Sequence, residues 1–263
     1  MSLHYEAAFF DIDGTLFSYK SYRYIPSTLA AIKRFQEEGG KAFISTARCY
    51  ALVKSFGTLN LGIRWDGVCA FEGGVVLADH QFLRNDRVPP SLMKRFCDLV
   101  IKEGYNAELL YPTTRYLLRP MEKWAKAYYS FFVDPVPSIR KYTDVPANGA
   151  ILIGPESARA TFEKAIPELE FNWFIDAGAD VSMPNGRDKG AGVSLLLKHF
   201  GIPKEKAIAF GDSVPDVEMK KAVDKLVIVA NGREEAKQAA DLICPEIDED
   251  GIAKTMDELV FSH

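Results

Sequence analysis

The sequence lacks the features that direct a protein to a membrane or to an oxidising compartment. No apolar run approaches the ~18 residues needed to cross a bilayer, and Asp11 and Asp13 interrupt the N-terminal stretch where a secretory signal would have its apolar segment. The chain has 4 cysteines, with no C-x-x-C pair and no histidine at metal-binding spacing, so we expect reduced, buried thiols. These absences predict a cytoplasmic protein without a membrane partner.

The charge balance argues against a nucleic-acid partner. Lys and Arg total 32 against 36 Asp and Glu, a net charge of −4, which provides no general attraction to a polyanion. The hydrophobic fraction of 48% over 263 residues is sufficient for a packed core and corresponds to between one and two domains. We therefore expect a globular protein, a monomer or a weak homodimer, that does not bind nucleic acid.

The N-terminal part follows a strand, helix, strand pattern. The apolar run at residues 7–10 has no polar alternation, which is typical of a strand covered on both faces, and it stops at Asp11. Ser27 is predicted to cap a helix whose apolar residues recur at helical spacing until Gly39. A second apolar strand follows at residues 42–44. This order predicts parallel strands joined by a crossover helix.

The C-terminal part repeats the pattern. A helix is predicted over residues 189–199, followed by a strand at 207–210 that ends at Asp212. Another helix around residues 217–222 leads to an apolar strand at 226–229. We expect these elements to complete the sheet that begins in the N-terminal part.

The middle of the chain differs from both ends in composition and in hydrophobic pattern. Residues 83–184 hold most of the prolines, two of the three tryptophans and short alternating strands, which indicate an α+β domain. We therefore predict an α/β core with a Rossmann-like, doubly wound parallel sheet, formed by residues 1–82 and 185–263. An inserted α+β cap domain is predicted at residues 83–184, because an insertion at a loop leaves the host sheet continuous.

Polar residues follow the predicted core strands at the points where these end. Asp11 and Asp13 follow the first strand, Thr46 the second and Asp212 a later one, and Asp216 lies four residues further on. Ligands of open parallel sheets bind outside the carboxyl ends of the strands. Several carboxylates in one crevice repel each other unless a cation binds between them, and hard oxygen ligands suit Mg²⁺.

Each of these residues also has an ordinary explanation when it is taken alone. Asp-x-Asp-Gly is common in turns, and Thr46 could be a satisfied hydroxyl at a strand end. Lys189 could be a solvated lysine in a first helical turn, although a cation there opposes the helix dipole and invites an anionic neighbour. Asp212 and Asp216 could be acids at a helix N-terminus. The combination, not the single residues, favours a site.

Four ordered motifs carry a family resemblance. The motifs are Asp11-Ile12-Asp13-Gly14-Thr15-Leu16, Ser45-Thr46-Ala47-Arg48, Asp188-Lys189-Gly190 and Gly211-Asp212-Ser213-Val214-Pro215-Asp216-Val217-Glu218-Met219. They resemble those of the haloacid dehalogenase-like hydrolase superfamily, and more narrowly those of the Cof-type phosphatases, whose large cap is inserted between the second and third motifs.

The resemblance implies a role for each matching residue. Asp11 would be the nucleophile that forms an aspartyl-phosphate, and Asp13 would be the general acid and base, with its backbone carbonyl on the metal. Thr46 would donate hydrogen bonds to the phosphoryl oxygens, and Lys189 would neutralise the charge of nucleophile and phosphoryl group.

The implied metal and phosphate sites extend this set. Asp212 would bind Mg²⁺ directly, and Asp216 would complete the metal or lysine environment, so that the expected metal set is Asp11, Asp13, Asp212 and Asp216. The expected phosphate contacts are Thr46, Ala47 and Lys189.

Three positions depart from the family pattern. Ala47 replaces a usual glycine, which is tolerable only if the backbone does not need a positive φ. Pro215 replaces an asparagine whose amide helps to hold phosphate, and proline is acceptable at the start of a helix. Glu72 stands where relatives have asparagine, and we interpret it as a turn acid.

Other features are interpreted as structural. In the cap, Arg115, Arg119 and Lys123 recur every four residues, but Pro120 argues against one continuous helix, so a solvated basic face is favoured over a substrate clamp. Asn231, before a glycine, is first a turn residue, with support of the active-site loop as the alternative.

The leading hypothesis is a Mg²⁺-dependent phosphatase for a small phosphorylated metabolite, a sugar phosphate or phosphorylated cofactor. A phosphomutase of the same superfamily is the first alternative. A non-catalytic phosphometabolite-binding protein is the second, and it is motivated by Pro215 and Ala47.

Overall fold

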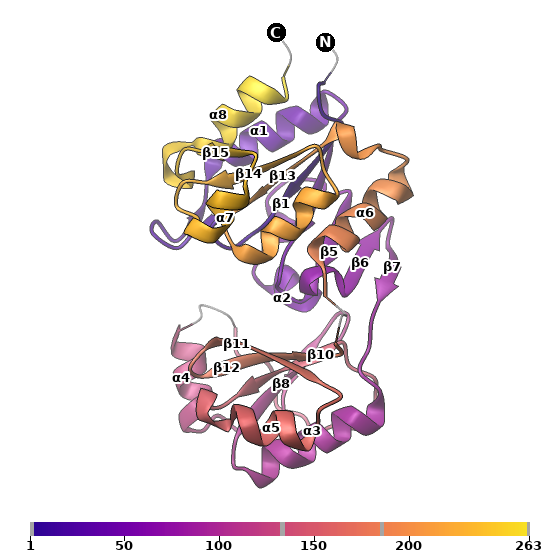
Figure 1. Ribbon diagram of the computed structural model, residues 1–263, viewed down its shortest axis with the longest axis vertical. Helices are drawn as coiled ribbons and strands as arrows, with labels where there is room; N and C mark the ends of the chain where they lie inside the picture. Colours follow the sequence, from indigo (N-terminus) through magenta and orange to yellow (C-terminus); the bar gives the residue numbers. More distant parts are fainter. Residues whose placement is uncertain (1–2, 132–134, 185–186, 262–263) are drawn as a thin grey trace. The chain divides into compact units, whose positions relative to one another are not determined.

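The computed structural model describes residues 3–131, 135–184 and 187–261, and the chain divides into two compact units (Figure 1). Residues 49–56, which were predicted to belong to the core domain, group in the structure with the inserted stretch. Unit 1 consists of Met1–Arg48, Gly57–Arg84 and Arg187–His263, and unit 2 consists of Cys49–Phe56 and Asn85–Gly186.

Unit 1 is built on an 8-stranded sheet with the order β15-β14-β13-β1-β4-β5-β6-β7. The pairs from β15 to β5 are parallel and β5 pairs with β6 antiparallel. This is the predicted doubly wound α/β core. The strands are β1 (Ala7–Phe10), β4 (Lys41–Ser45), β5 (Gly67–Ala70), β6 (Val75–Ala78), β7 (Gln81–Asn85), β13 (Ala207–Gly211), β14 (Lys225–Val229) and β15 (Leu242–Cys244).

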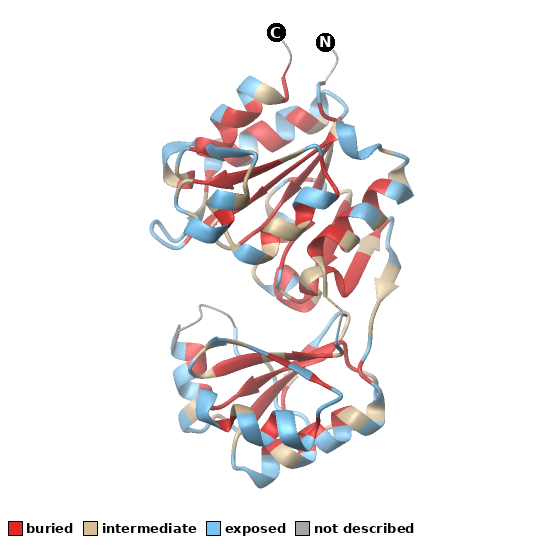
Figure 2. Ribbon diagram, in the orientation of Figure 1, coloured by how far each residue is buried: buried red, intermediate tan, exposed pale blue. Residues whose placement is uncertain are grey.

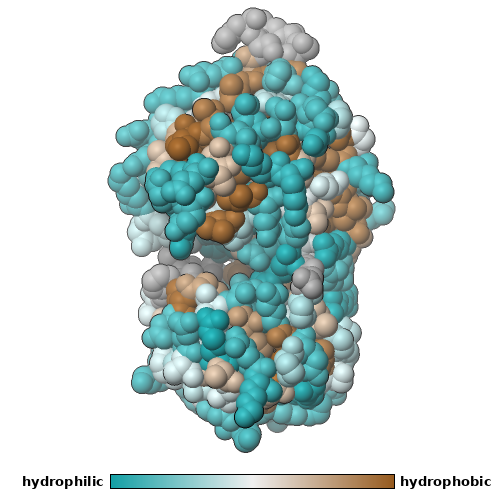
Figure 3. Space-filling view, viewed as in Figure 1, coloured by the Kyte–Doolittle hydropathy of each residue, from teal (hydrophilic) through white to brown (hydrophobic). Residues whose placement is uncertain are grey.

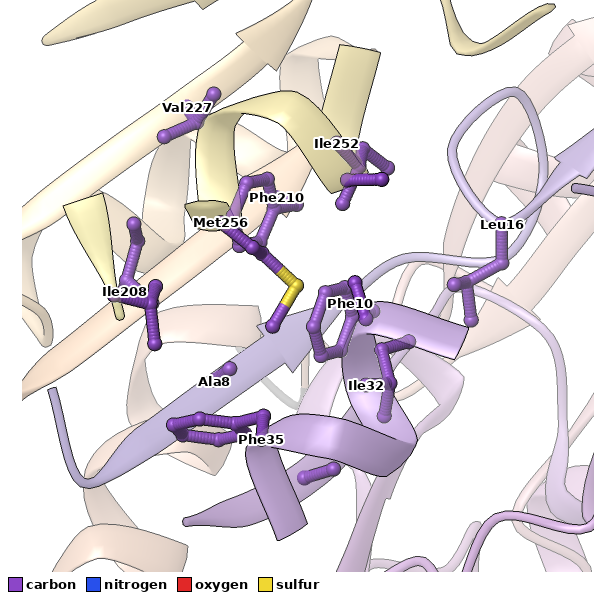
Figure 4. Packing of buried hydrophobic residues seen from close by; sticks show 14 of the residues in the cluster. Ala8, Phe10, Leu16, Ile32, Phe35, Ile208, Phe210, Val227, Ile252 and Met256 are labelled. Carbon is purple, nitrogen blue, oxygen red and sulfur yellow. The ribbon is translucent and has the colours of Figure 1, made fainter. Parts of the chain in front are cut away.

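Helices cover both faces of this sheet, and the sequence of β1 explains why. Its four residues are fully buried because alternate side chains enter two different cores. Ala8 and Phe10 pack with α1 and α8 (Figure 4), whereas Ala7 and Phe9 pack with α6, η5 and α7. The helical segments are α1 (Pro26–Glu37), α6 (Lys189–Phe200), α7 (Glu234–Ala239), α8 (Gly251–Leu259), and the 3₁₀ segments η1 (Thr58–Asn60), η2 (Phe71–Gly73), η4 (Lys204–Lys206), η5 (Val214–Lys221) and η6 (Ile247–Glu249).

A short hairpin follows β1 and frames one side of its carboxyl end. Its strands are β2 (Phe17–Ser18) and β3 (Arg23–Tyr24), which pair antiparallel. Ser18 is buried, and its hydroxyl donates to Asp248 at 2.6 Å while it accepts from the backbone N–H groups of Lys20 and Ser21. The hairpin is therefore fixed at its turn.

Unit 2 contains a 5-stranded antiparallel sheet with the order β11-β12-β10-β8-β9 and a hydrophobic core of its own. Phe162 of α5 is fully buried and packs near Phe96 of α3 and Phe171 of β11, and Figure 2 shows the buried strands above these helices. The elements are α2 (Tyr50–Ser55), α3 (Pro90–Lys102), β8 (Asn106–Leu110), β9 (Arg115–Leu117), α4 (Lys123–Phe131), β10 (Gly149–Ile153), η3 (Glu156–Ala158), α5 (Arg159–Ala165), β11 (Glu170–Ile175) and β12 (Gly178–Ser182).

Two local predictions are wrong. Ser27 does not cap α1: the N-cap is Ile25, Pro26 takes a first helical position, and the Ser27 hydroxyl donates to Asp250 instead. Arg115 does not lie on a solvated face. It is buried, and its guanidinium lies 2.7 Å from Glu108, because β9 places it beside a carboxylate on the neighbouring strand β8.

The surface shown in Figure 3 is mainly hydrophilic, with small scattered hydrophobic areas. Scattered exposed apolar side chains are normal for a folded domain. Among the described residues, no helix has the length and apolarity that a membrane crossing requires. The four cysteines are free and buried, as predicted.

Candidate active site

The polar ends of strands β1, β4 and β13 lie at one edge of the core sheet. These strands are adjacent and parallel, so their carboxyl ends meet there. Asp11 follows β1, and its backbone N–H donates to Phe210 of β13 at 3.0 Å. Thr46 follows β4, and its N–H donates to Cys69 of β5 at 2.8 Å. Backbone hydrogen bonds thus fix the positions of both residues.

Lys189, the first residue of α6, reaches into this edge. Its Nζ lies 2.9 Å from Asp11 Oδ1, 2.5 Å from Asp216 Oδ1 and 3.3 Å from the carbonyl oxygen of Ser45. Burial by itself disfavours the charged amine, but the two carboxylates outweigh it and raise the pKa of Lys189 above its ordinary value. Lys189 is therefore a buried ammonium that bridges two acids.

Asp216 is held mainly by protein donors. Its Oδ2 accepts from the backbone N–H of Asp212 at 3.0 Å, and from the N–H and hydroxyl of Ser213 at 2.9 and 2.8 Å. Ser213 and Asp216 form a capping box at the start of η5, in which Pro215 occupies one of the first helical positions. Asp216 thus orients Lys189 through its other oxygen. The sequence predicted both a place for Asp216 beside the lysine and an acid at a helix N-terminus, and the structure shows the two together.

Three carboxylates gather at one point. Asp11, Asp212 and Asp216 each place an oxygen within 4.8 Å of the others. Lys189 compensates Asp11 and Asp216, whereas Asp212 accepts a long hydrogen bond from Thr15 at 3.4 Å.

The electrostatics of this cluster fit a divalent cation. Burial, reinforced by Asp216, raises the pKa of Asp212 to about 7, and burial raises the pKa of Asp11 well above its usual range although Lys189 opposes it. Three carboxylates and one ammonium leave two negative charges to be neutralised. Oxygen ligands of this kind suit Mg²⁺, and Asp11 and Asp212 are the residues that would hold it.

Gly14 allows the first motif to approach Asp212 closely. Its φ is +79°, and a Cβ at this position would lie 2.3 Å from Asp212 Oδ2. Asn231 donates from Nδ2 to the Gly14 carbonyl at 2.9 Å and accepts from Ile247 N–H at 3.0 Å. Asn231 lies in a turn, as predicted, and its side chain also supports the loop that carries Gly14, the alternative considered for it.

Asp13 lies in a different environment from the other acids. Arg48 donates from Nε to Oδ2 at 2.7 Å and from an NH₂ group to Oδ1 at 2.8 Å, and the Tyr19 hydroxyl donates to Oδ1 at 2.6 Å. Burial by itself would raise the pKa of Asp13, but Arg48 and Tyr19 outweigh it and lower the pKa below its ordinary value. Sequence reasoning gave neither partner a role, because neither spacing nor residue type identifies them.

Thr46 is fully buried, and its Oγ1 accepts from the Arg48 backbone N–H at 3.2 Å. A hydroxyl that accepts there retains its own hydrogen for donation to a bound oxygen. Ala47 is exposed and does not have a positive φ, so the backbone tolerates the methyl group in place of glycine. Glu72 does lie in a turn, with φ +50°, and its carboxylate is 3.4 Å from Arg187.

Comparison with known proteins shows which class of enzyme has such an arrangement of residues. The family model described as haloacid dehalogenase-like hydrolase matches residues 8–256. The chain belongs to this family. It is an enzyme of the phosphatase group, a phosphoric monoester hydrolase.

Relatives and solved structures resemble the chain over nearly its full length. The Bacillus subtilis (strain 168) protein named putative phosphatase YkrA is 25% identical over 262 residues, covering 95% of this chain and 96% of that protein. The solved subclass IIB sugar phosphatase BT4131 is 27% identical with a TM-score of 0.80, covering 96% of this chain and 98% of its own. A hypothetical protein from Geobacillus kaustophilus HTA426 shares the fold, with a TM-score of 0.88 at 24% identity, covering 97% of this chain and 98% of its own.

Proposed function

We propose that this protein is a Mg²⁺-dependent phosphatase that hydrolyses a small sugar phosphate through an aspartyl-phosphate at Asp11. The observation that carries the proposal is the buried Lys189 ammonium shared by Asp11 and Asp216 beside the Asp212 carboxylate. The printed name of the sugar phosphatase that resembles this chain supports the substrate class.

In the first half-reaction, a carboxylate oxygen of Asp11 would attack phosphorus while the bond to the leaving oxygen breaks. Asp13, protonated at that stage, would give its proton to the leaving oxygen. Lys189 holds Asp11 in place, and Thr46 would donate to a phosphoryl oxygen. A bound Mg²⁺ would supply charge neutralisation for the nucleophile and the phosphoryl oxygens.

In the second half-reaction, water would attack the phosphorus of the aspartyl-phosphate. Asp13, now ionised, would take a proton from this water as the bond to Asp11 breaks and phosphate leaves. Asp216 acts through Lys189, which keeps the Asp11 carboxylate aligned for both steps.

The test is phosphate release from a panel of sugar phosphates with Mg²⁺ and with EDTA. We expect turnover in Mg²⁺, none in EDTA, and loss of turnover in Asp11→Asn with the fold retained. Asp79→Asn is the matched control, because this exposed acid pairs with His199 away from the site. In acid-quenched digests, the peptide that contains Asp11 should gain the mass of one phosphoryl group.

Several outcomes would contradict the proposal. These are turnover retained in Asp11→Asn, rates indifferent to EDTA, or a phosphorylated peptide from another part of the chain. Interconversion of sugar phosphate isomers without phosphate release would identify the phosphomutase instead. Binding of phosphate esters without any turnover would identify the non-catalytic binding protein.

A further inference from the structure

Tyr19 lies outside the four sequence motifs, but its side chain contacts Asp13 of the first motif. Its hydroxyl donates to Asp13 Oδ1 at 2.6 Å and accepts from Arg48 at 3.2 Å. The residue is 41% exposed, so its ring is only partly buried. Its hydroxyl makes hydrogen bonds to both Asp13 and Arg48.

The two oxygens of Asp13 are engaged unequally. Oδ1 accepts two hydrogen bonds, one from Tyr19 and one from Arg48, whereas Oδ2 accepts one, from Arg48 Nε. Both oxygens are therefore held by protein donors, Oδ1 by two and Oδ2 by one among the described residues.

The segment that carries Tyr19 is held in place by contacts other than the Tyr19 hydroxyl. The ring of Tyr19 packs edge-on against Phe17, with centroids 5.3 Å apart. The preceding residue, Ser18, is fixed by its hydrogen bond to Asp248. The backbone of Phe17 also forms a bridge with Asp13. The phenol is therefore presented to Asp13 from a preorganised hairpin rather than from a free loop.

We propose that Tyr19 is a positioning residue for Asp13: its hydrogen bond to Oδ1, together with the two from Arg48, holds the Asp13 carboxylate in a single orientation. The inference rests on the proposed function, because it concerns the general acid and base of that reaction. In the acid step the proton on Asp13 passes to the ester oxygen as the bond between that oxygen and phosphorus breaks and an oxygen of Asp11 bonds to phosphorus. Tyr19 keeps its own proton throughout.

The test uses Tyr19→Phe, which removes the hydroxyl and keeps the ring against Phe17. An alkyl leaving group needs the proton from Asp13, whereas the aryl leaving group of p-nitrophenyl phosphate needs it much less. With the sugar phosphate that the parent enzyme hydrolyses fastest, we expect kcat/KM to fall about tenfold through kcat, a fraction of the full contribution of general acid catalysis. With p-nitrophenyl phosphate, kcat/KM should stay within about twofold of the parent value, since kcat/KM reports the steps up to phosphoryl transfer to Asp11.

Tyr22→Phe is the matched control, because it removes a phenol from the same hairpin at a side chain that is 67% exposed. Tyr22→Phe should leave kcat/KM for both substrates unchanged. The melting temperatures of both variants should lie within about 2 °C of that of the parent. Unchanged turnover of the sugar phosphate in Tyr19→Phe, or an equal loss on both esters, would overturn the inference while leaving the proposed function intact. Absence of phosphate release by the parent from every ester would instead overturn the proposed function, and this inference with it.

Discussion

At the scale of single residues, the site depends on a few close approaches between segments distant in the sequence. Gly14 and Asp212 are the closest example, because no side chain beyond hydrogen fits between them. A substitution at Gly14 therefore affects the position of the Asp212 carboxylate and not only the backbone.

We expect Gly14→Ala to raise the Mg²⁺ concentration needed for half-maximal phosphate release by about tenfold, because the new methyl group displaces Asp212. Gly57→Ala is the matched control: its φ is +80° against +79° for Gly14, but a Cβ there meets nothing within 4 Å. Both variants should lose about 1 kcal/mol in the free energy of unfolding from the positive φ. Mg²⁺ titrations of activity and urea unfolding separate the two effects. Identical Mg²⁺ curves for the two variants would contradict the clash with Asp212.

The residues that could be predicted are those whose type and position already imply chemistry. Asp11, Asp212 and Lys189 follow or begin apolar elements, and the sheet rule brings such positions together. Tyr19 and Arg48 could not be assigned in this way, because their roles depend on how a hairpin and a loop turn their side chains towards Asp13. Asp216 was predicted both as a site residue and as an acid at a helix N-terminus, whereas its capping partner Ser213 was not predicted.

At the scale of elements, α6 connects the stability of the fold to the site, since it begins with Lys189, whose ammonium lies between Asp11 and Asp216. Its N-cap, Asp188, accepts from the Ala191 N–H at 3.0 Å and pairs with Lys221. Burial by itself would raise the pKa of Asp188, but the hydrogen bonds from Lys221 and the helix N-terminus lower it below its ordinary value of 3.8. The charged form is thus favoured in the folded protein.

Asp188→Ala should lower the free energy of unfolding at pH 7 by about 1 kcal/mol, and Asp188→Asn by less, because asparagine also caps helices. A depressed folded pKa gives stability that is present above the unfolded pKa of about 4 and is lost as the pH falls through the folded value. The difference between parent and Asp188→Asn should therefore shrink on acidification below pH ~4, as followed by urea unfolding.

Asp98→Asn provides the control for this comparison. Asp98 is an exposed acid paired with Lys94 in α3, and its loss should change the free energy of unfolding by less than about 0.5 kcal/mol. A difference between parent and Asp188→Asn that grows as the pH falls would contradict the assigned direction of the pKa shift.

Elements were predicted best where periodicity was strong and worst at their ends. The run of four apolar residues in β1 predicted a strand buried on both faces, and the structure confirms it. The start of α1 was misplaced because Pro26 already fixes a helical φ, so that Ser27 falls inside the helix. Arg115 was wrongly placed on a solvated face because the spacing of basic residues does not show that it lies in β9, diagonally opposite Glu108 of β8.

At the scale of the whole molecule, each unit has its own hydrophobic core. Phe162 is fully buried in the core of unit 2, and Phe35 is fully buried in a core of unit 1. Truncation to alanine at either position should lower the free energy of unfolding by about 3–5 kcal/mol. Because the two cores are separate, we expect each substitution to destabilise only the unit that contains it.

Hydrogen exchange measures this directly. Phe162→Ala should reduce amide protection in β8, β10, β11 and β12 and leave β1, β4 and β13 unchanged, whereas Phe35→Ala should give the reverse pattern. Equal loss of protection in both units from either substitution would show that the two units unfold as one cooperative body.

The order of strands in the core also constrains how the molecule is made. The strand that delivers Asp11 lies between β4 and β13, yet β13 begins at Ala207. During synthesis from the N-terminus, one edge of β1 therefore stays open while the whole of the inserted stretch emerges. A truncated chain that stops before Ala207 would contain Asp11 and an exposed sheet edge but would lack β13 and Asp212, and aggregation rather than partial activity is its expected fate.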